Sequence, residues 1–166
     1  ELNALGVYAG QLTSLAFNVT TLPTTNLPLT GYSIKVGSTS GTTLSTYVTG
    51  LTQVYAAPTS YAPVLGWNTF NFSAPYNWDG VSSVVFEICH NNDQSGTCTG
   101  GTGVCYGSST TVQYSVTSGN TVYGKYGDNS TAGWDICGGS SLPANTIATF
   151  NNRPNMKIGY GATTNF

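Results

Sequence analysis

Apolar and polar residues alternate along most of the chain, with the period of two that is typical of a β-strand exposed on one side. Leu15, Phe17 and Val19 alternate with small or polar residues, and the segment around Ile34 repeats the pattern. Glycine, proline or asparagine bounds each such segment. No stretch of ten or more residues repeats an apolar face at intervals of three and four. The pattern therefore predicts an all-β chain with almost no helix.

Nine segments follow this pattern, and each is predicted to be a short strand. Residues 118–120 form a short turn between two of them, so residues 111–116 and 121–126 are expected to pair as an antiparallel hairpin. The predicted strands cover residues 15–19, 32–36, 48–55, 67–72, 84–89, 111–116, 121–126, 146–150 and 155–160.

The spacing of these strands predicts the architecture. Strands this short, with threonine-rich outer faces, favour an antiparallel two-sheet β-sandwich, and the longer connections favour a jelly-roll-like topology. On the last strand, Met156, Ile158 and Tyr160 are expected to face inward. The fold class is therefore predicted to be all-β.

Composition favours a setting outside the cell. With 166 residues the chain has the length of one domain, so residues 1–166 are expected to form a single β-sandwich module of a larger protein. It contains 17 Ser, 26 Thr and 15 Asn, together 58 residues, whereas charged residues make up only 6%. Four cysteines in such a chain are typical of an oxidising exterior. The protein is expected to be secreted or displayed on a cell surface.

The same composition argues against several functions. Four Lys and Arg against six Asp and Glu give a net charge of −2, so no basic stripe is present to bind nucleic acid. No apolar run approaches the roughly 20 residues of a membrane span, so no membrane insertion is expected. With one His and six carboxylates, candidates for acid–base catalysis are few, and the chain is expected not to be an enzyme.

The four cysteines are Cys89, Cys98, Cys105 and Cys137, and they allow three disulfide pairings. Spacing favours Cys98 with Cys105, which leaves Cys89 with Cys137. Separations of nine, seven and thirty-two residues lack the paired short spacing of structural zinc modules, so disulfides are favoured over zinc.

Residues 90–110 and 127–145 are long, glycine-rich connections, and such loops often carry recognition in a β-sandwich. Trp134 could stack on a sugar ring while Asp135 and asparagines such as Asn92 bind its hydroxyl groups. The alternative is that Trp134 is a plug packed over one end of the sandwich. If the two loops share an end, a platform could be extended by Tyr106, Tyr123 and Tyr126.

The same two loops contain oxygen ligands suited to calcium. Asp93 follows Asn91 and Asn92, and Asp128 precedes Asn129. The alternative is ordinary turn chemistry, since Asp and Asn are common turn residues and no EF-hand spacing is present. No other cofactor is expected.

Other singular residues have structural explanations. Trp67 and Trp78 are expected to fill the core, and Asp79 is expected to be a turn residue. Glu87 faces away from Phe86 and Ile88 and has no partner carboxylate for glycoside hydrolysis, so it is expected to bond to a neighbouring strand or to Lys or Arg. His90 follows Cys89, and adjacent strand residues point to opposite faces, which argues against a catalytic dyad.

Seven short segments carry a family resemblance, and these are ELNALG (1–6), LTSLAFNV (12–19), YSIKVGST (32–39), GWNTF (66–70), NWDG (77–80), FEIC (86–89) and NRPN (152–155). In this order they resemble a β-sandwich module of large secreted surface proteins of Bacteroidetes that are exported by the type IX system, including gliding-motility adhesins and multidomain hydrolases. The resemblance spans residues 1 to about 160 and implies a non-catalytic module that helps a surface protein adhere or bind polymer. Such modules usually carry a further strand upstream, and the insertion at 93–106 is particular to this chain.

The sequence thus predicts an adhesion or binding module that recognises polysaccharide or another surface, next to other modules of the same chain. One alternative is a structural spacer in an adhesin stalk. Another is an accessory carbohydrate-binding module of a secreted hydrolase. A binder should expose Trp134 or several tyrosines on one patch, whereas a spacer should bury them.

Overall fold

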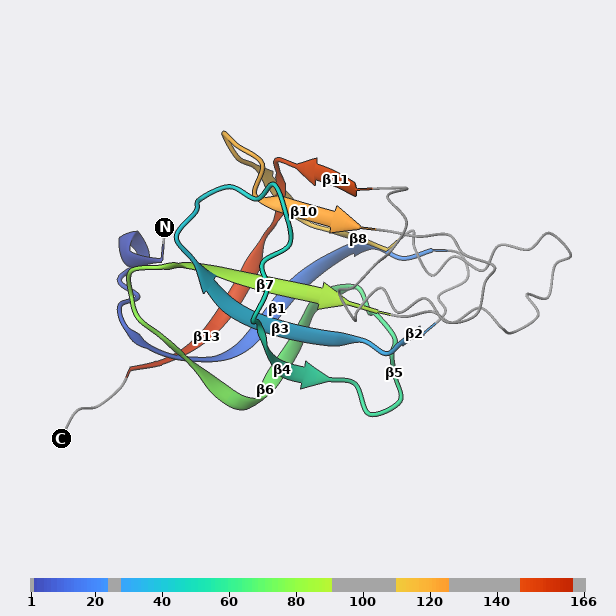
Figure 1. The fold of residues 1–166 in the computed structure, drawn as a ribbon. Helices are drawn as coiled ribbons and strands as arrows, with labels where there is room; N and C mark the ends of the chain where they lie inside the picture. The colour runs from blue at the N-terminus through green and yellow to red at the C-terminus, as the bar shows by residue number, and fades with distance from the viewer. Residues whose placement is uncertain (1, 24–27, 91–109, 126–146, 163–166) are drawn as a thin grey trace, which may run out of the picture.

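The computed structural model describes residues 2–23, 28–90, 110–125 and 147–162 of the chain. Antiparallel strands dominate these residues, and the helical content is a single 3₁₀ turn, η1 (Asn3–Leu5). Figure 1 shows the strands arranged in two main layers. The predicted all-β, sandwich-like fold is confirmed. Among the described residues, no helix has both the length and the apolar character needed to span a membrane.

The first sheet is built around β1 (Gly10–Thr21). β6 (Gly66–Trp78) pairs along one side of β1, and β13 (Met156–Ala162) pairs along the other. β8 (Thr111–Val112) continues the β13 side by pairing with the end of β1. All of these pairings are antiparallel.

A bulge in β1 explains an inward residue that simple alternation misses. The register shifts between Leu12 and Ser14 against both neighbouring strands. Because a bulge inserts one extra residue, Leu12 and Leu15 can both face inward although they lie three positions apart. Both side chains are fully buried. The alternating pattern predicted only residues 15–19 of this strand.

The second sheet places β3 (Ser33–Thr39) between β4 (Thr52–Ala56) and β7 (Ser83–Cys89). The core lies between the two sheets. Burying one such side chain stabilises a fold by about 1.5–3 kcal/mol relative to its exposure to water. Met156 and Ile158 pack against this core, as predicted for the last strand. The buried cluster comprises Leu15, Phe17, Leu29, Tyr32, Ile34, Val36, Val54 and Phe70.

The predicted hairpin between residues 111–116 and 121–126 is wrong. β9 (Tyr114–Val116) pairs with β12 (Asn152–Pro154), and β10 (Val122–Lys125) pairs with β11 (Ile147–Phe150). The remaining short pair is β2 (Leu29–Thr30) with β5 (Ser60–Tyr61).

Residues 117–121 connect β9 to β10 as a loop and do not form the expected hairpin turn. The N–H of Thr117 donates to the carbonyl of Asn151 at 2.8 Å, and the N–H of Thr121 donates to that of Phe150 at 3.0 Å. The carbonyl of Asn120, near the tip, accepts from the N–H of Leu44 at 2.8 Å. Turn chemistry detects only the local reversal, whereas partners distant in sequence decide the pairing here.

The two tryptophans predicted for the core behave differently. Trp78 is buried, and its indole N–H donates to the carbonyl of Ser82 at 2.8 Å. Trp67 is 41% exposed, so its assignment to the core is wrong. Its neighbours Asn68 and Phe70 take the inward positions of β6, which leaves Trp67 on the opposite side.

Candidate functional site

Most of the site residues predicted from the long loops lie outside the described residues. The sugar-binding, calcium and disulfide predictions for them therefore stay predictions. Cys89, which is described, is buried and is not a free thiol. The residues outside are Asn92, Asp93, Cys98, Cys105, Tyr106, Tyr126, Asp128, Trp134, Asp135 and Cys137.

Tyr123 lies within the described residues, and its ring packs against that of Tyr47. The two rings meet edge to face, with centroids 4.7 Å apart and planes at 77°. Burial raises the pKa of Tyr47, and Tyr123 and Glu87 raise it further. Tyr123 therefore packs against the connection between β3 and β4.

The carboxylates on β7 and in the turn before it have structural partners, as predicted. Glu87 Oε1 forms an ion pair with Lys35 Nζ at 2.7 Å across the β3–β7 pair. Asp79 accepts from the Ser82 hydroxyl at 2.5 Å and from the N–H groups of Val81 and Ser82 at 2.9 and 2.8 Å. The Ser82 hydroxyl, followed by these backbone donors, holds the pKa of Asp79 below its usual value. Both carboxylates hold local structure.

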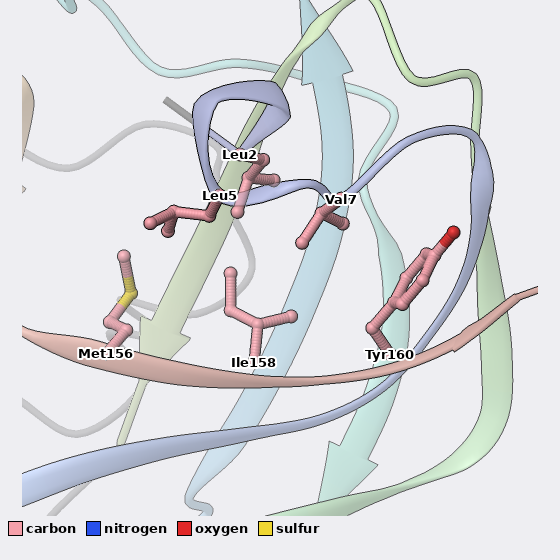
Figure 2. A pocket seen from close by; sticks show the side chains of 6 residues that line it. All are labelled: Leu2, Leu5, Val7, Met156, Ile158 and Tyr160. Carbon is pink, nitrogen blue, oxygen red and sulfur yellow. The ribbon is translucent and has the colours of Figure 1, made fainter.

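A small pocket lies where the N-terminal segment meets β13. Its volume is about 130 Å³, and Figure 2 shows side chains from the two segments pointing toward one another. The polar atom at its edge, the hydroxyl of Tyr160, donates to the carbonyl of Ala9 at 3.2 Å. The pocket is therefore an apolar packing gap. It is lined by Leu2, Leu5, Val7, Met156, Ile158 and Tyr160.

The strongest candidate site is the outer face of the first sheet, the side turned away from the second sheet. Alternation along β1 sends Leu15 and Phe17 into the core and turns Ala16 and Asn18 outward. Directly paired strand residues share a face, so Trp67 lies beside Asn18. The outer face includes Asn18, Thr20, Trp67, Thr69, Gln113 and Lys157.

Lys157 reaches across β1 to the indole of Trp67. Its Nζ lies 4.0 Å from the ring centroid, within the range of a cation–π contact. Lys157 is paired with Ala16 on one side of β1, and Trp67 is paired with Asn18 on the other. Ala16 is only 3% exposed despite facing outward, because the lysine stem and the indole converge over it.

Amides and hydroxyls continue the face beyond the indole. Asn18 Nδ2 donates to Gln113 Oε1 at 3.0 Å, and the hydroxyls of Thr20 and Thr111 are 3.0 Å apart. Among the described residues, no further hydrogen bond engages Asn18 Oδ1 or Gln113 Nε2. An acceptor and a donor on this exposed face thus have no protein partner in the described part of the chain.

Sequence reasoning missed Trp67, although the signal was present. In the segment WNTFNF, Trp67 shares its phase with Thr69 and Asn71, whereas Phe70 and Phe72 share the opposite phase. Two phenylalanines mark the inner face, so the pattern itself turns the indole outward. A general preference of tryptophan for the interior gave the wrong assignment.

No family model, no curated protein and no solved structure matches this chain. The resemblance to surface modules of Bacteroidetes therefore stays an expectation from the seven sequence segments.

Proposed function

We propose that this chain is a non-catalytic module of a large secreted surface protein, and that it binds polysaccharide through the outer face of the first sheet. The observation that carries the proposal is the exposed indole of Trp67 on an otherwise polar sheet face. An indole offers a broad apolar surface that can stack on the apolar side of a sugar ring. A solvent-exposed tryptophan held in this way favours binding over a purely structural role.

Polar groups beside the indole are suited to hydrogen-bond the hydroxyl groups of a stacked sugar. Asn18 Oδ1 can accept from a hydroxyl, and Gln113 Nε2 can donate to one. The hydroxyls of Thr20 and Thr111 extend the row along the same edge of β1. An open sheet face of this kind suits an extended polymer, whereas a small molecule is usually enclosed in a pocket.

Other features favour adhesion as the biological role. The chain is rich in Thr, Ser and Asn, and only 6% of its residues are charged, as expected for a secreted module. The carboxylate of Glu87 is held by Lys35, which favours a structural role for it over acid–base chemistry.

The direct test is retention of the purified chain in gels that contain polysaccharides of different backbones. We expect retention by at least one of them. Trp67→Ala should weaken the affinity about tenfold or more, because losing about 1.4 kcal/mol of binding free energy from the stacking contact corresponds to a factor of ten. The melting temperature should change little, since the indole is on the outer face.

Tyr8→Ala is a matched control. Tyr8 is also an exposed aromatic residue, at 65%, but it precedes Gly10, which lies at the opposite end of β1 from the partner of Trp67. The control should bind like the unmodified chain. Equal binding by Trp67→Ala and the unmodified chain would refute the proposed site, and failure to bind any polysaccharide would refute the function.

A further inference from the structure

The charges of the described residues are distributed unevenly around the sandwich. Asp79 lies in the turn after β6, at the end of the sheet remote from Trp67, and Glu87 lies on the second sheet against Lys35. Lys157, in contrast, lies on the outer face of the first sheet beside the indole. Within the described part of the chain, the charge that β1, β6 and β13 present on this face is thus positive.

The ammonium group of Lys157 can exchange its contact with Trp67 for a contact with an anionic ligand. At an exposed site a cation–π contact is weak, whereas a hydrogen bond from an ammonium group to a carboxylate or sulfate is charge-assisted and stronger. Nζ lies over the indole, 4.0 Å from the ring centroid, so a sugar ring that stacks on this face has to displace it. An anionic substituent there could take the ammonium group while the sugar takes the ring.

We infer that the polysaccharide recognised by this face is acidic, and that Lys157 binds its carboxylate or sulfate group while Trp67 stacks on the sugar that carries it. The inference rests on the proposed function and names the ligand class for the same site. Asn18 and Gln113 then bind uncharged hydroxyls of the neighbouring sugar. Lys157 is the residue that separates acidic from neutral chains.

The net charge of the whole chain makes this prediction specific. At −2 the protein repels polyanions in general, so attraction has to come from the local site. Binding through the single cation Lys157 should weaken only gradually as salt rises, in contrast to the steep dependence of a basic polyanion binder.

The test uses two matched pairs of polymers. Polygalacturonate is compared with its methyl ester, which has the same backbone without the charge, and dextran sulfate is compared with dextran. Calorimetry on the unmodified chain should show at least tenfold tighter binding to the acidic member of at least one pair. The two pairs distinguish carboxylate from sulfate as the anion.

Three variants then assign the effect. Lys157→Met keeps the apolar stem and should reduce binding to the acidic polymer about tenfold, without changing binding to its neutral counterpart. Lys157→Arg keeps the charge and should retain the preference. Trp67→Ala should weaken binding to both members of the pair.

Each failure has its own meaning. If the chain binds acidic and neutral members equally, binds only neutral polymers, or keeps its preference in Lys157→Met, the acidic specificity is wrong, whereas the proposed function stands as long as Trp67→Ala weakens binding. If the chain binds none of these polymers and none of the polysaccharides in the retention gels, both the acidic specificity and the proposed function fail.

Discussion

Asn68 shows how one buried polar side chain organises a connection. It is 6% exposed, and its amide makes four hydrogen bonds. Oδ1 accepts from the hydroxyl of Tyr61 at 2.5 Å and from the N–H of Val64 at 3.0 Å, and Nδ2 donates to the carbonyls of Val64 and Gly66 at 2.7 and 2.8 Å. The side chain therefore holds the segment before β6 in place, immediately beside Trp67.

We expect Asn68→Ala to lower the free energy of unfolding by about 3 kcal/mol, because several part-buried donors and acceptors lose their partner at once. Urea denaturation measures the change. Asn71→Ala, at an exposed position of the same strand, is the control and should stay within about 0.5 kcal/mol of the unmodified chain. Equal effects of the two substitutions would contradict the role of Asn68.

Aromatic residues of the core make stability sensitive to alkali. Tyr32 stacks on Phe70, with ring centroids 5.1 Å apart, and lies 4.6 Å from Tyr61. Burial raises the pKa of Tyr61 to about 12, helped by Tyr55, and burial raises that of Tyr32 well above its usual range. Ionisation is thus disfavoured in the folded state.

A tyrosine pKa raised by folding gives stability that is complete below the unfolded pKa of about 10 and is lost as the pH rises above it. We therefore expect the free energy of unfolding to fall above about pH 10. Tyr32→Phe should make this fall shallower, since one ionising group is removed. Urea denaturation at several alkaline pH values measures the slope, and an unchanged slope in the variant would contradict the assignment.

At the scale of elements, alternation predicted where most strands lie and which way they face. It succeeded for β3 and β13, where the pattern is uninterrupted. It also located β7, although consecutive apolar residues interrupt the pattern there and Ile88 is 40% exposed. It failed for partner choice, because β9 and β10 take partners distant in sequence. It also placed residues 48–51 in a strand, whereas the structure has them in the connection before β4, where Leu51 packs close to Gly37 of β3.

The turn after β6 shows a contact that no local pattern reveals. Gly80 has a φ of +77°, and a Cβ built there would lie 2.5 Å from the backbone nitrogen of Ala9. The carbonyl of Gly80 also accepts from Asn3 Nδ2 at 3.0 Å. The turn and the N-terminal segment therefore approach too closely for any side chain.

Gly80→Ala should accordingly destabilise the protein by about 3 kcal/mol, of which about 1–2 kcal/mol comes from the left-handed backbone and the rest from the clash with Ala9. Gly6 separates the two causes, because it has the same φ of +77° with open space around its Cβ position. Gly6→Ala should cost only the backbone part. Thermal unfolding of both variants measures the difference, and equal losses would rule out the close approach.

For the whole molecule, the N-terminal segment closes one end of the sandwich over β13. Asn3 binds the turn after β6, and Tyr160 binds the carbonyl of Ala9, so this segment is tied to two parts of the fold. The closure is imperfect, since the pocket of about 130 Å³ remains beneath it (Figure 2). Space of this kind forfeits packing contacts at the boundary between the segment and the sheet.

Filling that pocket should therefore stabilise the entire fold. Val7 points toward Ile158 and Tyr160 in Figure 2, so Val7→Leu adds one methylene group to the gap. Burial of a methylene group contributes about 0.8 kcal/mol, and we expect a gain of that order in the free energy of unfolding and a higher melting temperature. Val81→Leu is the matched control, because Val81 is 88% exposed and the same substitution should leave stability unchanged. A gain in the control as large as that in Val7→Leu would trace the effect to general hydrophobicity, whereas a gain confined to Val7→Leu would establish that the N-terminal segment packs on β13 as an integral part of the sandwich.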